Sequence, residues 1–135
     1  MRALALVIAA LGTAGAAGAE TPAVNYLLQC QGCHRENGAG TPGSVPALAG
    51  FVAEFLTVPG GREYLVRVPG SAQSPLSDAA LAELLNWIVK RFGPDEAAAS
   101  AAPFSEAEVA KLRRPPLIDV EATRRALVDR IEESG

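Results

Sequence analysis

The sequence predicts an all-α protein, and three observations support this prediction. Apolar residues recur at the i, i+3, i+4 and i+7 spacing of a helix over residues 77–92. Helix-start signals occur at Thr21-Pro22 and at Ser105, which Glu108 follows three residues later. No βαβ pattern is visible in the sequence, so a parallel sheet is not expected.

The first 19 residues predict a secretory signal peptide. Arg2 precedes an apolar run over residues 3–11, and Ala17-Gly18-Ala19 forms an A-x-A-like cleavage site before Glu20. The apolar run is too short to span a bilayer comfortably. We therefore expect cleavage and export to the periplasm, with an uncleaved anchor as the alternative and no stable membrane span after cleavage. Residues 20–135 would then form the mature protein.

The next region predicts one helix, a long loop and two short helices. Thr21 is a suitable N-cap and Pro22 suits the first helical position, so a helix should run from there to Cys30. Residues 35–50 should form a loop, because turn residues interrupt any regular pattern. These turn residues are Asn37-Gly38, Gly40, Pro42-Gly43 and Pro46. Short helices are expected at residues 51–57 and 62–68.

The clearest helix is predicted for residues 77–92. Ser77 and Asp78 suit its start, and Gly93-Pro94 should end it. Its inward face should carry Leu81, Leu84, Leu85, Ile88, Val89 and Phe92. Trp87 lies on the same helix and is expected in the core. Residues 68–75, rich in Pro, Gly and Ser, should form a loop before it.

The C-terminal third predicts a linker followed by a helical extension. Residues 94–103 are rich in alanine and are interpreted as a linker between a domain of residues 20–93 and an extension of residues 104–135. Ser105 and Glu108 fit a capping box, which predicts a helix to about Leu112. Residues 119–132 predict a last amphipathic helix with its arginines outward. We expect the extension to pack on the first domain; a partner-binding arm is the alternative.

Residues 30–34 read Cys30-Gln31-Gly32-Cys33-His34, the attachment signature of c-type haem. Residues three apart on a helical turn lie on the same side. Cys30 and Cys33 can therefore both reach the edge of one porphyrin and form thioethers with its two vinyl groups. His34 follows directly and would bind the iron, since a proximal histidine is a standard ligand of haem iron.

Other chemistry is possible for a Cys-x-x-Cys pair and has to be weighed. A zinc site needs about four ligands, whereas two cysteines and a single histidine are available here. A thioredoxin-type pair normally lies near a βαβ pattern, which this sequence lacks. Dithiol or disulfide chemistry remains the main alternative to haem.

Residues 22–92 resemble a small monohaem cytochrome c of the class I type. The resemblance is carried by the Cys30–His34 motif and by three further segments. These segments are Asn37-Gly38-Ala39-Gly40, Pro46-Ala47-Leu48-Ala49-Gly50 and Leu76-Ser77-Asp78. It implies three to four helices around one covalent haem, with the first and last helices crossing near it. It also implies that the carbonyl of Pro46 accepts a hydrogen bond from the ring of His34, the iron ligand, which would fix and tune that ligand.

The sequence departs from this family on the other side of the iron. In the family a methionine from the loop before the last helix usually supplies the sixth ligand. Here residues 68–75 contain no Met, His, Cys or Lys, and Met1 belongs to the predicted signal peptide. The weak candidates that remain are Gln73, Asn25, Asn86, Tyr64 and a lysine from outside the loop. The sequence thus predicts an open sixth position and a reduction potential below that of His/Met cytochromes.

Charge and composition narrow the class of partner. The net charge is −3, and loss of Arg2 with the signal peptide makes it one unit more negative. No basic cluster is present, so nucleic acid is not an expected partner. No general base or nucleophile accompanies the haem motif, so an enzyme is not expected, although weak peroxidase-like activity stays open for any haem with a free coordination position. We expect an electron carrier for another redox protein, such as a dehydrogenase, a reductase or a second cytochrome. The alternatives are a binder or sensor of NO, CO or O2 and an accessory haem subunit of a larger redox enzyme.

Overall fold

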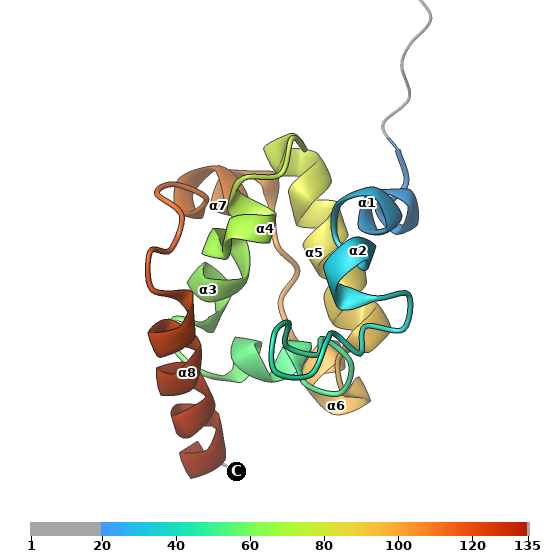
Figure 1. Ribbon diagram of the computed structural model, residues 1–135. Helices are drawn as coiled ribbons and strands as arrows, with labels where there is room; N and C mark the ends of the chain where they lie inside the picture. The colour runs from blue at the N-terminus through green and yellow to red at the C-terminus, as the bar shows by residue number, and fades with distance from the viewer. Residues whose placement is uncertain (1–19, 135) are drawn as a thin grey trace, which may run out of the picture.

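The computed structural model describes residues 20–134, and over that range it confirms an all-α architecture (Figure 1). The helices are α1 (Pro22–Gln29), α2 (Gln31–His34), the 3-10 helix η1 (Val52–Thr57), α3 (Gly61–Arg67), α4 (Pro69–Ala72), α5 (Asp78–Phe92), α6 (Asp95–Ser100), α7 (Glu106–Leu112) and α8 (Val120–Ser134). Strand pairing in the described range is limited to an isolated bridge between Thr41 and Val45. The predicted signal peptide, residues 1–19, lies outside the described residues.

Helices α1, α5 and α7 begin where the sequence predicts them, because side chains cap their free N–H groups. The hydroxyl of Thr21 accepts from the N–H of Val24 at 3.4 Å, and that of Ser77 accepts from Ala80 at 3.1 Å. Ser105 accepts from the N–H of Glu108 at 3.2 Å, as one half of a capping box requires. The six residues expected on the inner face of α5 are all buried.

Helices α1 and α5 pack against each other through aromatic side chains. The ring of Tyr26 on α1 lies 5.3 Å from Trp87 and 5.1 Å from Phe92, measured between centroids. Such offset and tilted pairs are favourable in buried positions. Trp87 packs against the hydrophobic core, as the sequence predicts. The crossing of α1 and α5 places the Cys30–His34 motif, which follows α1, at the edge of the core.

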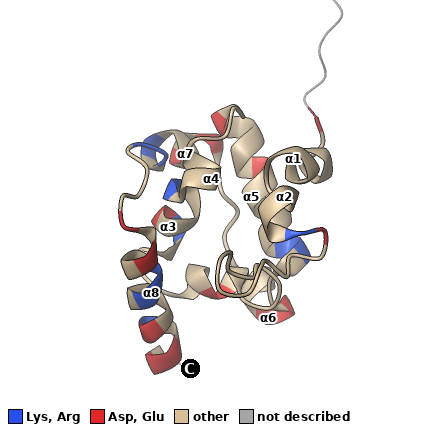
Figure 2. Cartoon of the chain, viewed as in Figure 1, with Lys and Arg blue, Asp and Glu red and all other residues tan. Residues whose placement is uncertain are grey.

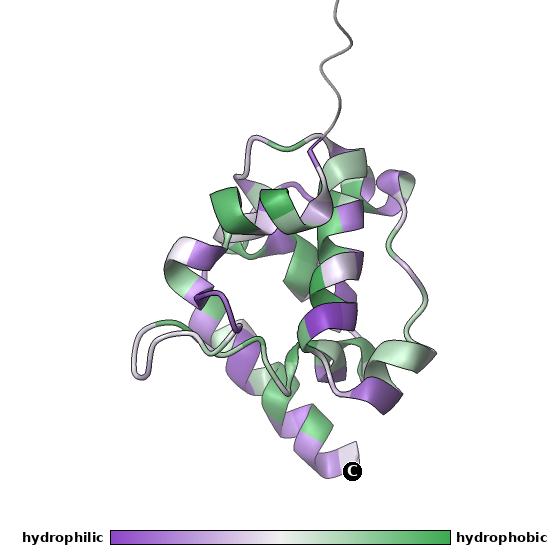
Figure 3. Cartoon of the chain, turned by 90° about the vertical axis from the view of Figure 1, so that its right-hand side faces the viewer, coloured by the Kyte–Doolittle hydropathy of each residue, from purple (hydrophilic) through white to green (hydrophobic). Residues whose placement is uncertain are grey.

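The C-terminal extension packs on the rest of the molecule through its own apolar side chains. Phe104, Val109 and Leu127 are all buried in the common core. Helix α8 is amphipathic, because its apolar residues Val120, Leu127, Val128 and Ile131 pack in or against the core; green and purple patches are mixed along its ribbon in Figure 3. The segment predicted as a linker differs from that interpretation, since it contains α6 and buries Ala97. Alanine-rich composition reports local preference and not the burial that a neighbouring surface imposes.

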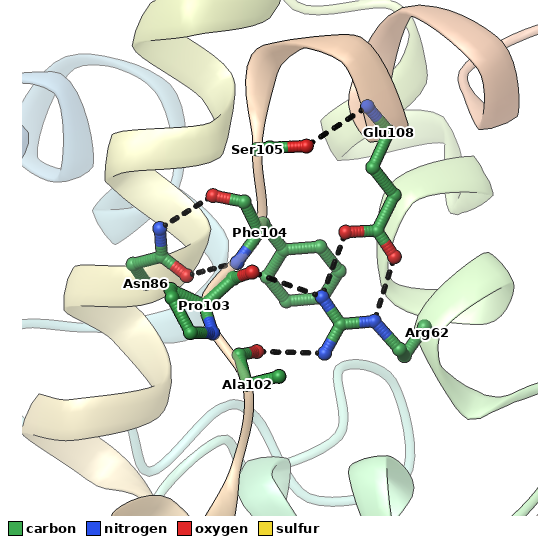
Figure 4. Close-up of polar contacts among 7 residues, drawn as sticks. All are labelled: Arg62, Asn86, Ala102, Pro103, Phe104, Ser105 and Glu108. Atoms are coloured by element: carbon green, nitrogen blue, oxygen red, sulfur yellow. Dashed lines mark hydrogen bonds and ion pairs between the residues drawn. The ribbon is translucent and has the colours of Figure 1, made fainter.

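Polar contacts also fix the extension (Figure 4). Arg62 on α3 makes a two-pronged ion pair with Glu108 on α7, at 2.6 and 2.8 Å. The same guanidinium donates to the carbonyl of Ala102 at 2.8 Å and stacks 4.1 Å above the ring of Phe104. The side chain of Asn86 on α5 exchanges two hydrogen bonds with the backbone of Phe104, at 2.9 and 2.7 Å. Helices α3 and α5 belong to the region of residues 20–93, called here the haem-motif domain because it contains residues 30–34. These two helices thus hold one short stretch of the extension.

Arg113, at the end of α7, holds the segment between α4 and α5. Its guanidinium donates to the carbonyls of Ala72 and Leu76 at 3.1 and 2.7 Å, and to the carboxylate of Asp78 at 2.9 Å. It also donates to the backbone and side chain of Ser74. Arg113 is 7% exposed, so these bonds compensate its burial. The predicted loop of residues 68–75, which contains the short helix α4, is therefore tied to the extension.

Candidate cofactor site

The Cys30–His34 motif occupies one helical turn. Cys30 ends α1, and its carbonyl accepts from the N–H groups of Cys33 and His34 at 3.2 and 2.9 Å. Cys30 is half-buried and Cys33 is exposed. The backbone of this turn therefore has the helical geometry that places Cys30 and Cys33 on one side, as their spacing predicts.

The imidazole of His34 is held by the backbone of the following loop. Its Nδ1 lies 3.1 Å from the carbonyl oxygen of Pro46. A carbonyl can only accept a hydrogen bond, so Nδ1 carries the proton and Nε2 keeps a free lone pair. Burial lowers the pKa of His34, and the Pro46 hydrogen bond partly offsets this effect. A neutral imidazole with one free nitrogen is the form that binds metals.

Two tight contacts hold this loop in place. Gly40 has φ of +66°, and a Cβ there would lie 2.3 Å from the carbonyl oxygen of Val45 and 2.7 Å from that of Pro46. Glycine is required where backbones approach this closely in a left-handed conformation. On the other side of the motif, the hydroxyl of Tyr26 donates to the carbonyl of Arg35 at 2.6 Å. The chain entering and leaving the histidine is therefore fixed.

A cavity of about 920 Å³ lies beside the motif. One wall is formed by Cys30, Cys33, His34 and the loop of residues 39–48, and the opposite wall by residues of α3, α4 and α8. These two sets of elements lie on opposite sides of the molecule in Figure 1. Apolar side chains line the cavity: Leu48, Val52, Phe55, Leu65, Val68, Leu85, Ile88 and Val120. Its size and lining are those of a site for a large apolar ligand.

The alternatives to haem find no support in this geometry. Burial and the neighbouring Cys33 raise the pKa of Cys30 to about 11. A redox dithiol needs the opposite, a thiol whose pKa is lowered so that the thiolate can attack. Among residues 20–134, no cluster of three or more His, Cys, Asp or Glu side chains is placed to hold a metal ion. A zinc site built from the protein's own side chains is therefore not present in this range.

Of the four named weak candidates for the sixth ligand, one lines the cavity. Tyr64 lines the cavity, whereas Asn25, Gln73 and Asn86 do not. The amide of Asn25 donates to the carbonyl of Glu20 at 3.3 Å, and Asn86 is bonded to Phe104. Asn86 and Lys90 line a second, smaller cavity of about 430 Å³ under the segment of residues 95–104.

The contribution of α8 to the cavity was not predicted from the sequence. Val120, Glu121 and Arg124, all in the first turns of α8, line it. The sequence predicts that the arginines of this helix point outward. Arg124 is instead half-buried, and its guanidinium carbon lies 5.8 and 5.9 Å from the ring centroids of Phe51 and Phe55. The i, i+4 spacing of Val120 and Arg124 was a usable signal, because it places both on one face.

Comparison with known proteins identifies the family. A cytochrome c-552 of Thermus thermophilus is 37% identical over 121 residues, which cover 76% of this chain and 82% of the relative. A second cytochrome c-552 of Thermus thermophilus is 39% identical over 107 residues, covering 66% of this chain and 82% of the relative. The chain belongs to the c-type cytochromes. No protein-family model matches the sequence.

Membership gives the cytochrome its cofactor and its general role. It carries covalently bound haem c and is an electron carrier rather than an enzyme. The site fits this group, because two thiols, a neutral imidazole and an apolar cavity of sufficient size lie together. Haem supplies an iron that cycles between ferric and ferrous states, and the protein supplies attachment, orientation and electrostatics. An electron carrier requires redox partners. The helices described within residues 20–134 include none with the length and hydropathy of a membrane span.

Proposed function

We propose that this cytochrome is a periplasmic one-electron carrier whose haem is attached to Cys30 and Cys33 and bound through iron by His34. The observation that carries the assignment is the hydrogen bond from His34 to Pro46, 3.1 Å long, on the cavity wall that also bears both thiols. That bond selects the tautomer with a free Nε2 and makes the imidazole a stronger donor to iron. Cys30 and Cys33 lie on the same helical turn, as two thioether bonds to one porphyrin edge require.

The surface around α1 supports transfer to a protein partner through apolar contact. Leu27 and Leu28 are 54% and 62% exposed, and they shortly precede the motif. Helix α1 contains no charged residue, so its ribbon is tan throughout in Figure 2. We infer that the exposed face of α1 contacts the redox partner, since a patch of exposed apolar side chains beside a redox site is a common feature of docking surfaces. Association should then depend only weakly on salt.

The attachment is tested by producing the protein in cells with an active cytochrome c maturation system. The wild type should give one haem per chain in the pyridine haemochrome assay, and the haem should stay with the polypeptide in a denaturing gel. Cys33→Ser should leave a single thioether and shift the reduced pyridine haemochrome band. His34→Ala should keep covalent haem but lose the spectrum of a histidine-bound iron. A colourless wild-type protein would contradict the proposal.

The location is tested separately by cell fractionation and N-terminal sequencing. The coloured protein should appear in the periplasmic fraction and begin at Glu20, as the cleavage site Ala17-Gly18-Ala19 predicts. A product that keeps residue 1 and sediments with membranes would instead show an uncleaved anchor.

A further inference from the structure

We propose that the cavity contains a binding position for a small anion, which would bind the iron of the attached haem, and that the Tyr64 hydroxyl donates a hydrogen bond to it. The inference rests on the proposed haem attachment and extends it to a ligand class. A small anion here means a two- or three-atom species such as cyanide or azide, which binds ferric iron and accepts a hydrogen bond through its outer atom.

The first support is that the described cavity lining offers no strong iron ligand besides His34. Among the described residues lining the cavity, His34 is the sole imidazole, and neither methionine nor lysine is present. Cys30 and Cys33 are committed to the thioethers. The segment of residues 72–78 cannot readily rearrange to supply a ligand, because Arg113 holds its backbone through the bonds to Ala72, Ser74 and Leu76.

The second support is the state of Tyr64. Its side chain lines the wall opposite the motif, and the residue is only 6% exposed. Its hydroxyl makes no hydrogen bond to any described residue, and its oxygen is not fully enclosed by protein atoms. Tyr26, the other tyrosine, follows the usual rule for buried phenols through its bond to Arg35. A hydroxyl at a cavity wall without a protein partner is suited to a ligand inside the cavity.

Tyr64 is also in the correct chemical form to donate. Burial raises its pKa, and the opposing effect of nearby Arg124 is smaller. The hydroxyl therefore stays protonated at neutral pH. A protonated phenol is a weak iron ligand and a good hydrogen-bond donor, which favours a role beside the iron-bound species rather than on the iron itself.

The third support is the charge at the cavity wall. Arg124 is the one Lys or Arg side chain among the lining residues that the structure describes. Glu121 also lines this cavity, and its carboxylate is paired with Arg125 at 3.3 Å. Arg124 makes no ion pair within residues 20–134. Its positive charge favours an anion over a neutral ligand in the cavity.

The test is an azide titration of the ferric holoprotein followed by its optical spectrum. The wild type should respond with a saturable shift. Tyr64→Phe should raise the dissociation constant of azide about tenfold, because one hydrogen bond to a charged acceptor is lost. The matched control is Thr57→Val, which removes an exposed hydroxyl outside the cavity and should leave the azide constant within about twofold of the wild type. Thermal unfolding of both variants separates a binding effect from a loss of fold.

Carbon monoxide bound to the ferrous protein gives a second readout. A donor beside the bound gas lowers the CO stretching frequency, so Tyr64→Phe should raise it while changing CO affinity by less than about threefold. Equal azide constants and equal CO frequencies in wild type and Tyr64→Phe would overturn the role of Tyr64. A low-spin ferric protein that ignores azide would overturn the open position and leave covalent attachment intact. Absence of haem in the pyridine haemochrome assay would instead overturn the proposed function.

Discussion

At the scale of single residues, the geometry of the Cys30–His34 turn could be predicted from the sequence, and the cavity wall contributed by α8 could not. The motif Cys30–His34 is local, so its spacing alone predicts one helical turn. The contact of His34 with Pro46 followed from the resemblance to class I cytochromes, and the structure places the two atoms 3.1 Å apart. Arg124 lies far along the chain from this motif, and its orientation depends on how α8 docks. The i, i+4 spacing places Arg124 on the same face as Val120, but it does not determine which element that face contacts.

Arg124 gives a prediction about the reduction potential. A positive charge near the haem favours the ferrous state, which carries one positive charge fewer, so Arg124→Gln should lower the potential. We expect a decrease of about a few tens of millivolts for a charge in a partly buried position. Redox titration of the holoprotein measures it. Arg130→Gln is the control, because Arg130 lies on the same helix, is exposed and does not line the cavity; an equal decrease there would point to a general surface-charge effect.

Gly40 gives a prediction about the proximal hydrogen bond. Gly40→Ala would press a Cβ against the carbonyl oxygens of Val45 and Pro46 and displace the acceptor of His34. A weaker hydrogen bond makes the imidazole less basic, stabilises ferric iron less, and should raise the reduction potential. Gly50→Ala is a matched control, since Gly50 also has a left-handed φ of +75°, meets nothing within 4 Å and does not line the cavity. Both variants should lose about 1–2 kcal/mol of stability from backbone strain, and only Gly40→Ala should shift the potential.

At the scale of elements, helix starts were predicted well because capping is local, whereas packing was predicted less well. Ser77 and Ser105 cap α5 and α7 as expected. The segment of residues 94–103 has the composition of a linker, yet it contains α6 and contributes Ala97 to the core. Its structure depends on contacts with elements that are remote in sequence. The Arg62–Glu108 pair, 46 residues apart, is of this kind.

This ion pair gives a pH-dependent prediction. The bond from Arg62 lowers the pKa of Glu108 below its ordinary value of 4.5. The pair therefore contributes stability that is fully present above that value and is lost as the pH falls through the lowered pKa. Glu108→Gln should remove about 1 kcal/mol at pH 7 and flatten the decline of stability below about pH 4.5. Denaturant unfolding across pH measures both effects. Arg125→Gln, which removes the exposed pair with Glu121, should change stability by less than about 0.5 kcal/mol.

At the scale of the whole molecule, the C-terminal extension and the haem-motif domain form one body around the cavity. Helix α8 supplies part of the cavity wall, and Arg113 at the end of α7 fixes the segment where related proteins usually carry a methionine. The extension thus contributes to the cavity wall, a role that the resemblance of residues 22–92 to class I cytochromes did not predict. An alanine-rich connection and a polar last helix gave no indication of this role, because it depends on the assembled fold.

This arrangement predicts a reduction potential below that of cytochromes with His/Met ligation. A methionine sulfur stabilises ferrous iron, and none is present among residues 20–134. Arg124 acts in the opposite direction, and we expect its effect to be smaller than that of a lost axial ligand. Potentiometric titration gives the value, and adding a small thioether in excess should raise it if the position is open. A potential in the range of His/Met carriers, together with a low-spin spectrum that ignores added ligand, would show that a protein side chain occupies the sixth position after all.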